Sequence, residues 1–127
     1  MNDGRQRRGF ERGSGTVLVA GVTLVLLLLT GLLAVVIGYL AAQNDARGAA
    51  DLVALSAAAE RVRGTDACLA AKATASANRV SVVSCRVVGD SLDFVVSVTV
   101  ARTVDFDVAV LPRRVLASAK AGRLGLG

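Results

Sequence analysis

An uncharged, mostly apolar run from Gly13 to Asn44 constrains this chain more than any other feature. The run exceeds the roughly 20 residues that an α-helix needs to cross a hydrocarbon core about 30 Å thick. Val and Leu dominate residues 17–29, so a helix here has no polar face to turn toward water. The sequence therefore predicts one transmembrane helix over residues 13–44.

Charged residues flank this run unevenly. A basic arm, residues 1–12, precedes it, whereas Asp45, Arg47 and Asp51 follow it with mixed sign. The positive-inside rule then keeps the arm in the cytoplasm, next to anionic lipid headgroups, and sends the rest of the chain across the membrane. We predict a single-pass protein of the cell membrane with an extracytoplasmic C-terminal part. The residues that set this topology are Arg5, Arg7, Arg8 and Arg12.

A cleavable secretory signal is the alternative interpretation of the same run. Such signals have an apolar core of about 7 to 15 residues, followed by a cleavage site with small residues at alternate positions. The run is longer than that, and Leu40-Ala41-Ala42 is a poor version of the site. Release of the outer part by cleavage near Gln43 stays open as an alternative.

The segment outside the membrane is small. We predict an extracytoplasmic domain over residues 45–121 and a flexible tail over 122–127, and about 80 residues lie near the lower limit for a self-supporting core. Cys68 and Cys85 both follow the run, on the side where oxidation is permitted. We expect a disulfide that closes a loop of roughly 17 residues and adds about 3 kcal/mol. Two buried free thiols are the alternative.

The pattern of helix formers, turn residues and β-branched residues predicts an α+β fold. The long helix is expected to begin near Thr16 and to continue outside the membrane to about Arg63, because Gly48 is the only helix breaker between Ala41 and Glu60. Thr65 or Asp66 caps a short second helix, and a small antiparallel sheet follows. The expected elements are a helix over 67–78, strands over 79–88 and 92–100 around a turn at Gly89-Asp90, an extended piece over 104–110, and a last strand or short helix over 115–121.

Small residues recur at every fourth position of the long helix. In the membrane this spacing lets two helix backbones approach closely. Beyond Ala46 the alternative is that the alanines pack against the protein's own sheet. The Ala-rich composition could also produce such a row by itself. The predicted helix-packing residues are Thr30, Ala34, Gly38 and Ala42.

The residues that carry most enzyme chemistry are missing. The chain has no histidine, so the usual general base and the usual metal ligand are absent, and we expect no enzyme, no metal and no cofactor. Asp105 and Asp107 could bind a cation weakly, but solvated charges at a sheet edge are the favoured interpretation. The net charge is +5, but four of the basic residues lie in the arm, and the 11 Lys and Arg that follow it exceed the 8 Asp and Glu by only three. Those later charges have no interleaved aromatic residues, so nucleic acid is not an expected partner.

Two segments resemble a known family. The chain is similar to the TadE/TadG-like family of tight-adherence (Flp) pilus-assembly proteins, and in outline to the short, secretion-neighbourhood members of that family. The similarity lies in Arg12-Gly13-Ser14-Gly15-Thr16-Val17, which the apolar helix follows, and in the stretch from Ala46 to Leu55. The resemblance implies a pilin-like or pseudopilin-like component of an Flp (Tad) pilus or type IV-related secretion machinery. Its implied partners are membrane lipid, other pilin-like subunits and secretion or pilus-assembly proteins, and self-association is an open alternative.

The resemblance also points to a candidate processing site. Family members with the full signal are cut after a glycine and carry a glutamate at the fifth position of the mature chain. If Gly13 is that glycine, Ser14 becomes the first residue and Leu18 the fifth. The missing glutamate leaves processing open and favours a minor or accessory subunit. A monomeric extracytoplasmic binding protein, tethered to the membrane or released from it, is the alternative function.

Overall fold

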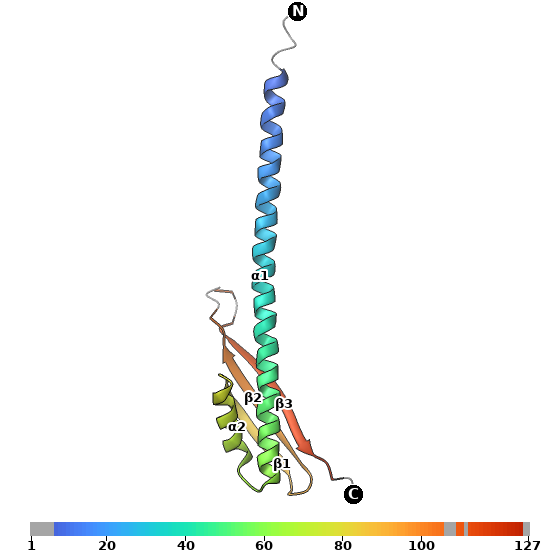
Figure 1. Ribbon diagram of the computed structural model, residues 1–127, viewed down its shortest axis with the longest axis vertical. Coiled ribbons are helices and arrows are strands. Elements are labelled where there is room, and N and C mark those ends of the chain that lie inside the picture. The colour runs from blue at the N-terminus through green and yellow to red at the C-terminus, as the bar shows by residue number, and fades with distance from the viewer. Residues whose placement is uncertain (1–6, 106–108, 111, 126–127) are drawn as a thin grey trace, which may run out of the picture. The chain divides into compact units, whose positions relative to one another are not determined.

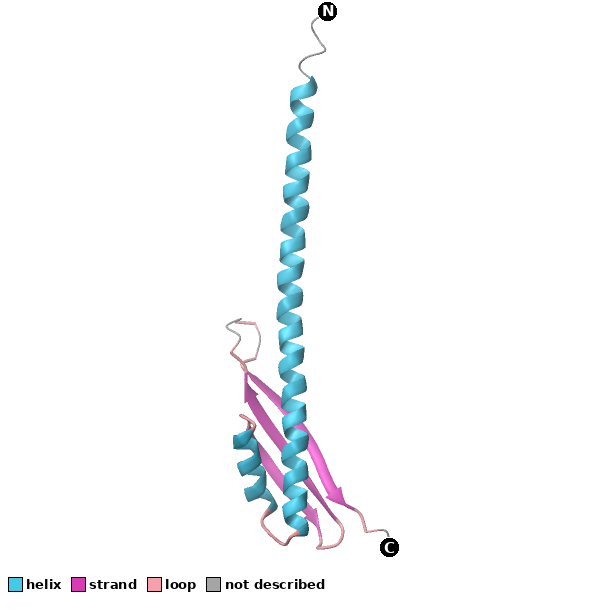
Figure 2. Cartoon of the chain, in the orientation of Figure 1, coloured by secondary structure: helices cyan, strands magenta, loops and turns pink. Residues whose placement is uncertain are grey.

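The computed structural model describes residues 7–105, 109–110 and 112–125, with the backbone alone for residues 7–12. The chain forms two helices and a three-stranded antiparallel sheet, which confirms the predicted α+β outline (Figures 1 and 2). It divides into two compact units, residues 1–38 and 39–127, with the boundary inside the first helix. The elements are α1 (Arg7–Val62), α2 (Ala67–Ala77), β1 (Ser81–Gly89), β2 (Phe94–Thr103) and β3 (Arg114–Arg123).

Helix α1 is 56 residues long and starts at Arg7 rather than near Thr16. The predicted start is too late because the arm contains good helix formers and no proline, so the helical hydrogen-bond pattern continues into it. Over Gly13–Val62 the helix is long and apolar enough to cross a membrane, with a mean hydropathy of 2.7 in its most apolar stretch. None of that stretch is buried within the protein.

Two threonine hydroxyls of the first unit form hydrogen bonds within the helix itself. The hydroxyl of Thr23 donates a hydrogen bond to the carbonyl of Val19 at 2.8 Å, and the hydroxyl of Thr30 donates to the carbonyl of Leu26 at 2.8 Å. Such bonds to the preceding turn remove the cost of placing a hydroxyl in an apolar environment. Both threonines are therefore compatible with a hydrocarbon surrounding.

The second unit has one hydrophobic core between a helix layer and the sheet. The inner face of β2 supplies Phe94, Val96, Val98 and Val100, which are buried completely or nearly so. Against them pack mainly alanines, because small side chains allow helices to lie close to a sheet. These buried helix residues are Ala46, Ala49, Ala50, Val53, Ala54 and Ala57 of α1, and Ala67, Ala71 and Ala75 of α2.

Asp66, one of the two residues predicted as the cap, is the N-cap of helix α2. The carboxylate of Asp66 accepts hydrogen bonds from the backbone N–H groups of Cys68 and Leu69, at 2.9 and 3.1 Å. This satisfies two donors that the first helical turn leaves without a partner. The helix ends at Ala77 and not at the predicted Asn78, which is the C-cap residue.

The sheet has the order β1-β2-β3, with both pairs antiparallel. The third strand is longer than predicted: Gly122 pairs with Val95 and Arg123 pairs with Phe94. At these two positions, which belong to the segment predicted as a flexible tail, the backbone pairs with β2. The backbone N–H of Gly125 also donates to the carboxylate of Asp93.

The extended piece expected over 104–110 does not add a strand within the described residues. Positions 104, 105, 109 and 110 are assigned to no strand, and the remaining three positions lie outside the described residues. Val104 still contacts the core and donates its backbone N–H to the carbonyl of Arg113 at 2.8 Å. The described residues between β2 and β3 thus form a connection and not a further strand.

The β1–β2 turn requires a glycine. Gly89 has a φ of +112°, which L side chains rarely adopt, and an added Cβ atom would collide with the backbone of Asp93. Asp90 then accepts hydrogen bonds from the backbone N–H groups of Asp93 and Leu92, both at 2.8 Å. These bonds lower the pKa of Asp90 by stabilising its charged form. The predicted turn at Gly89-Asp90 is confirmed.

Candidate interaction surfaces

The predicted helix-packing residues differ in exposure along α1. Thr30 and Ala34 are exposed, whereas Gly38 and Ala42 are half-buried. Thr30 uses its hydroxyl within its own helix and can offer only its methyl group to a neighbour. Packing against a second helix stays a prediction. Farther along the row, Ala46, Ala50 and Ala54 are buried, as expected if they receive the protein's own sheet.

The candidate processing residues lie in the early turns of α1. Gly13, Ser14 and Leu18 are helical and exposed, so the peptide bond between Gly13 and Ser14 lies within a helix. Of the four topology arginines, Arg5 lies outside the described residues. The other three, Arg7, Arg8 and Arg12, belong to the backbone of α1.

The two cysteines form the expected disulfide. Cys68 in the first turn of α2 is bonded to Cys85 in β1, with 5.8 Å between their Cα atoms. The bridge spans 17 positions of sequence and ties the short helix to an edge strand of the sheet. Cys85 is half-buried against the core, so the bridge adds apolar contact as well as a covalent link.

The part of α1 that belongs to the second unit, residues 39–62, has a surface that faces away from the sheet, which we call the helix surface. It combines two carboxylates with exposed leucines, of which Leu52 is 53% and Leu55 is 60% exposed. Arg47, also exposed, lies on the same stretch of helix. The helix surface consists of Asp45, Gly48, Asp51, Leu52, Leu55 and Ala59.

The face of the sheet that does not contact the helices forms a second surface, which we call the sheet surface. Strand register places its polar side chains in two rows. One row contains the hydroxyl residues Ser84, Thr99 and Ser118, and the other contains Arg86, Ser97 and Lys120. Together they line a shallow depression of about 410 Å³.

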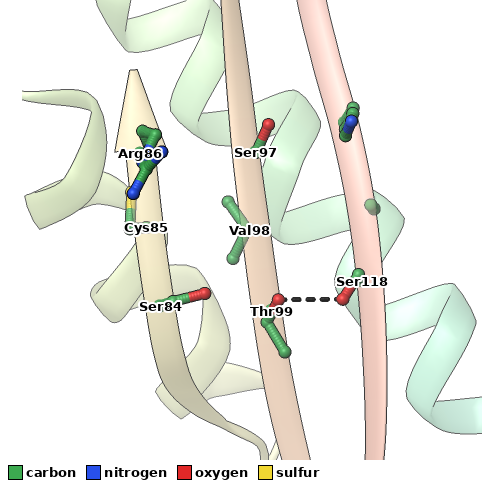
Figure 3. A pocket seen from close by; sticks show the side chains of 9 residues that line it. Ser84, Cys85, Arg86, Ser97, Val98, Thr99 and Ser118 are labelled. Carbon is green, nitrogen blue, oxygen red and sulfur yellow. Dashed lines mark hydrogen bonds between the residues drawn. The ribbon is translucent and has the colours of Figure 1, made fainter. Parts of the chain in front are cut away.

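Figure 3 shows this sheet surface from close by, with the hydroxyl groups of Thr99 and Ser118 joined by a hydrogen bond of 2.8 Å. The nine residues that line the depression include two cations and no acidic side chain. Arg86 and Lys120 lie on the outer strands, one on each side of Ser97. Positive charge and hydroxyl donors are thus the chemistry that the sheet surface offers to a partner.

Sequence reasoning missed the sheet surface as a unit. The alternation of β2 predicts that Ser97 and Thr99 point away from the core, but it does not say which residues of β1 and β3 lie beside them. The bulge between Val82 and Ser84 sets the register of the first pair. The register between strands depends on how the inner face packs, so the sequence pattern of a single strand does not predict it.

The described residues contain no group of three His, Cys, Asp or Glu side chains that could hold a metal ion. Asp105 is exposed, and its predicted companion Asp107 lies outside the described residues. Comparison of the chain with protein-family models, with curated proteins and with solved structures finds no match in any of the three.

Proposed function

We propose that the protein is a membrane-anchored, pilin-like or pseudopilin-like component of an Flp (Tad) pilus or type IV-related secretion machinery. The observation that carries this proposal is the double use of α1. One uninterrupted helix contains the apolar stretch and also supplies Ala46, Val53 and Ala57 to the core of the second unit, residues 39–127, which we call the outer unit. A helix that served only as a tether would not need to form part of the domain it holds.

The proposal includes a location. The apolar stretch crosses the cell membrane once, with the basic N-terminal arm in the cytoplasm and the α+β domain outside. The Cys68–Cys85 disulfide supports this orientation, because such bonds persist in oxidising compartments. The partners are then membrane lipid, other pilin-like subunits and secretion or pilus-assembly proteins, whereas nucleic acid has no part.

Protein contacts are the proposed mode of action. In lipid there is no hydrophobic drive between apolar helices, so close packing of small residues and release of lipid favour their association. Ala34 and Gly38 provide such a place in the outer half of the apolar stretch. The outer unit then presents its own surfaces to neighbouring subunits.

Cysteine crosslinking within the span tests this proposal. In cells that express the full chain at its native level, Ala34→Cys and Gly38→Cys should each give a crosslinked product with a second copy or another subunit. Val36→Cys is the matched control, because it lies about 200° around the helix from Ala34 and should give several-fold less product. No free thiol occurs among the described residues, so the background is low.

Replacement of the apolar segment separates this function from its alternative. A monomeric tethered binding protein should keep its function when residues 17–40 are exchanged for an unrelated transmembrane sequence. An assembly component should lose it. Equal crosslinking at positions 34 and 36, together with full function of the exchanged chain, would overturn the proposal.

A further inference from the structure

The helix surface and the sheet surface lie on opposite sides of the outer unit and differ in charge. The inner face of the sheet packs on the helices, so the sheet surface points away from α1. It carries Arg86 and Lys120 without a neighbouring acid, while the helix surface carries Asp45 and Asp51. A single chain thus presents two surfaces of unlike chemistry on the two outer sides of one two-layer domain.

We propose that the sheet surface of one copy binds the helix surface of a second copy of this chain. The cations of the first surface then face the carboxylates of the second. The inference rests on the proposed function in one respect, because insertion in the same membrane supplies a second copy with the same orientation. A neighbour's helix would cover the open face of the sheet and complete a helix–sheet–helix sandwich.

The spacing of the charges fits this pairing. Arg86 and Lys120 are separated by two strand spacings, about 10 Å. Asp45 and Asp51 are six residues apart in an α-helix, so their side chains project about 120° apart around the axis, on the two flanks of the helix surface, with a rise of about 9 Å between them. A helix that lies along the strands can thus direct one carboxylate toward each outer strand, and the long Arg and Lys side chains span the offset along the axis. Charge complementarity of this kind selects one partner surface over others and fixes its register.

Apolar side chains border the charges on both surfaces. On the helix surface Leu52 and Leu55 follow Asp51 within one turn or so, and both are more than half exposed. On the sheet side Leu116 lies two residues before Ser118 in β3, and Val88 lies two residues after Arg86 in β1. The two side chains are 61% and 60% exposed. Exposed apolar residues next to complementary charges are typical of surfaces that bind another protein.

The pairing has a consequence for assembly. The two surfaces are different, so each copy uses its sheet surface toward one neighbour and its helix surface toward another. Such a head-to-tail contact extends into an open chain unless its rotation closes a ring. Copies that share one membrane orientation can form this contact by translation and rotation about the membrane normal, without inverting either molecule.

A photocrosslinking experiment tests the inference in the full membrane-inserted chain. A photoreactive residue in place of Ser97, between the two cations, should form an adduct with residues 44–55 of a second, differently tagged copy. The double change Asp45→Lys, Asp51→Lys should lower the adduct about tenfold, because two favourable charge pairs become repulsive. The double change Arg86→Glu, Lys120→Glu should do the same.

Combining the four reversals in one chain should restore the adduct, since the charges are again opposite. Arg47→Glu is the matched control on the same stretch of helix and should leave the adduct unchanged or raise it. The urea concentration at which each purified variant unfolds, compared with that of the wild-type chain, shows whether the outer unit is folded. An adduct with a different protein, or an adduct that ignores the reversals, would overturn the pairing.

The outcome is separable from that of the proposed function. Crosslinks through Ala34→Cys that persist while Ser97 gives no adduct with a second copy would reject this interface and retain assembly through the span. Loss of both kinds of crosslink would reject the assembly function as well. Restoration of the adduct by the combined reversals supports both.

Discussion

Replacing Phe94 with alanine should destabilise the outer unit by about 3 to 5 kcal/mol, the range observed when a large buried aromatic side chain is removed from a core. Among the described residues, Phe94 is the largest side chain that is almost completely buried, at 2% exposure. The helices facing the sheet supply mainly alanines, which are too short to fill the space left behind. The core has no second aromatic residue among its buried members to compensate.

Leu92→Ala is the matched control for this change. Leu92 lies two residues before Phe94 and is 66% exposed, so its truncation should alter the free energy of unfolding by no more than about 0.5 kcal/mol. Urea unfolding of the detergent-solubilised full chain, followed by the circular dichroism of the sheet, measures both. Equal losses from the two variants would show that the core is not built around Phe94.

Removing the disulfide should lower the free energy of unfolding nearly as much as Phe94→Ala does. With Cys68→Ala and Cys85→Ala together, we expect the outer unit to lose about 3 kcal/mol, because a crosslink that closes a loop of this length restricts the unfolded chain. Helix α2 is otherwise held by three buried alanines, which bury little apolar area. It should be the first element to detach, and proteolysis should begin in or next to it.

Chemical reduction provides the comparison for this prediction. The wild-type chain in a strong thiol reductant should unfold at the same urea concentration as the double alanine variant, since each lacks only the bridge. The double variant itself should not respond to reductant. An unchanged midpoint of the wild-type chain on reduction would contradict a stabilising role for the bridge.

Local chemistry explains which parts of the fold are predictable from the sequence. The cap of α2, the turn at Gly89-Asp90 and the alternation of β2 each depend on residues within one turn or one strand, so the local pattern predicts them, although it leaves Thr65 and Asp66 both open as the cap. The disulfide was predictable because the chain has only two cysteines. Both cysteines follow the apolar run, on the side of the membrane that the topology argument predicts to be oxidising, and this favoured their pairing.

The parts that could not be predicted depend on contacts between distant segments. Gly122 and Arg123 look like a flexible end until β2 offers them a ladder. Likewise, Ser97 is an ordinary outward residue until register places a cation on each side of it. Helix α1 begins before the apolar run because helix propensity continues into the arm, so hydropathy marks the apolar stretch but not the first residue of the helix.

The most direct test of the account is the location of the outer unit in living cells. Leu92→Cys places one thiol in the exposed β1–β2 turn, while the two native cysteines are already bonded to each other. In intact cells a membrane-impermeant maleimide should label this thiol fully, and the labelled chain should stay in the membrane pellet after alkaline extraction. A chain that is labelled only after the cells are opened, or that is extracted as a soluble protein, would contradict the account.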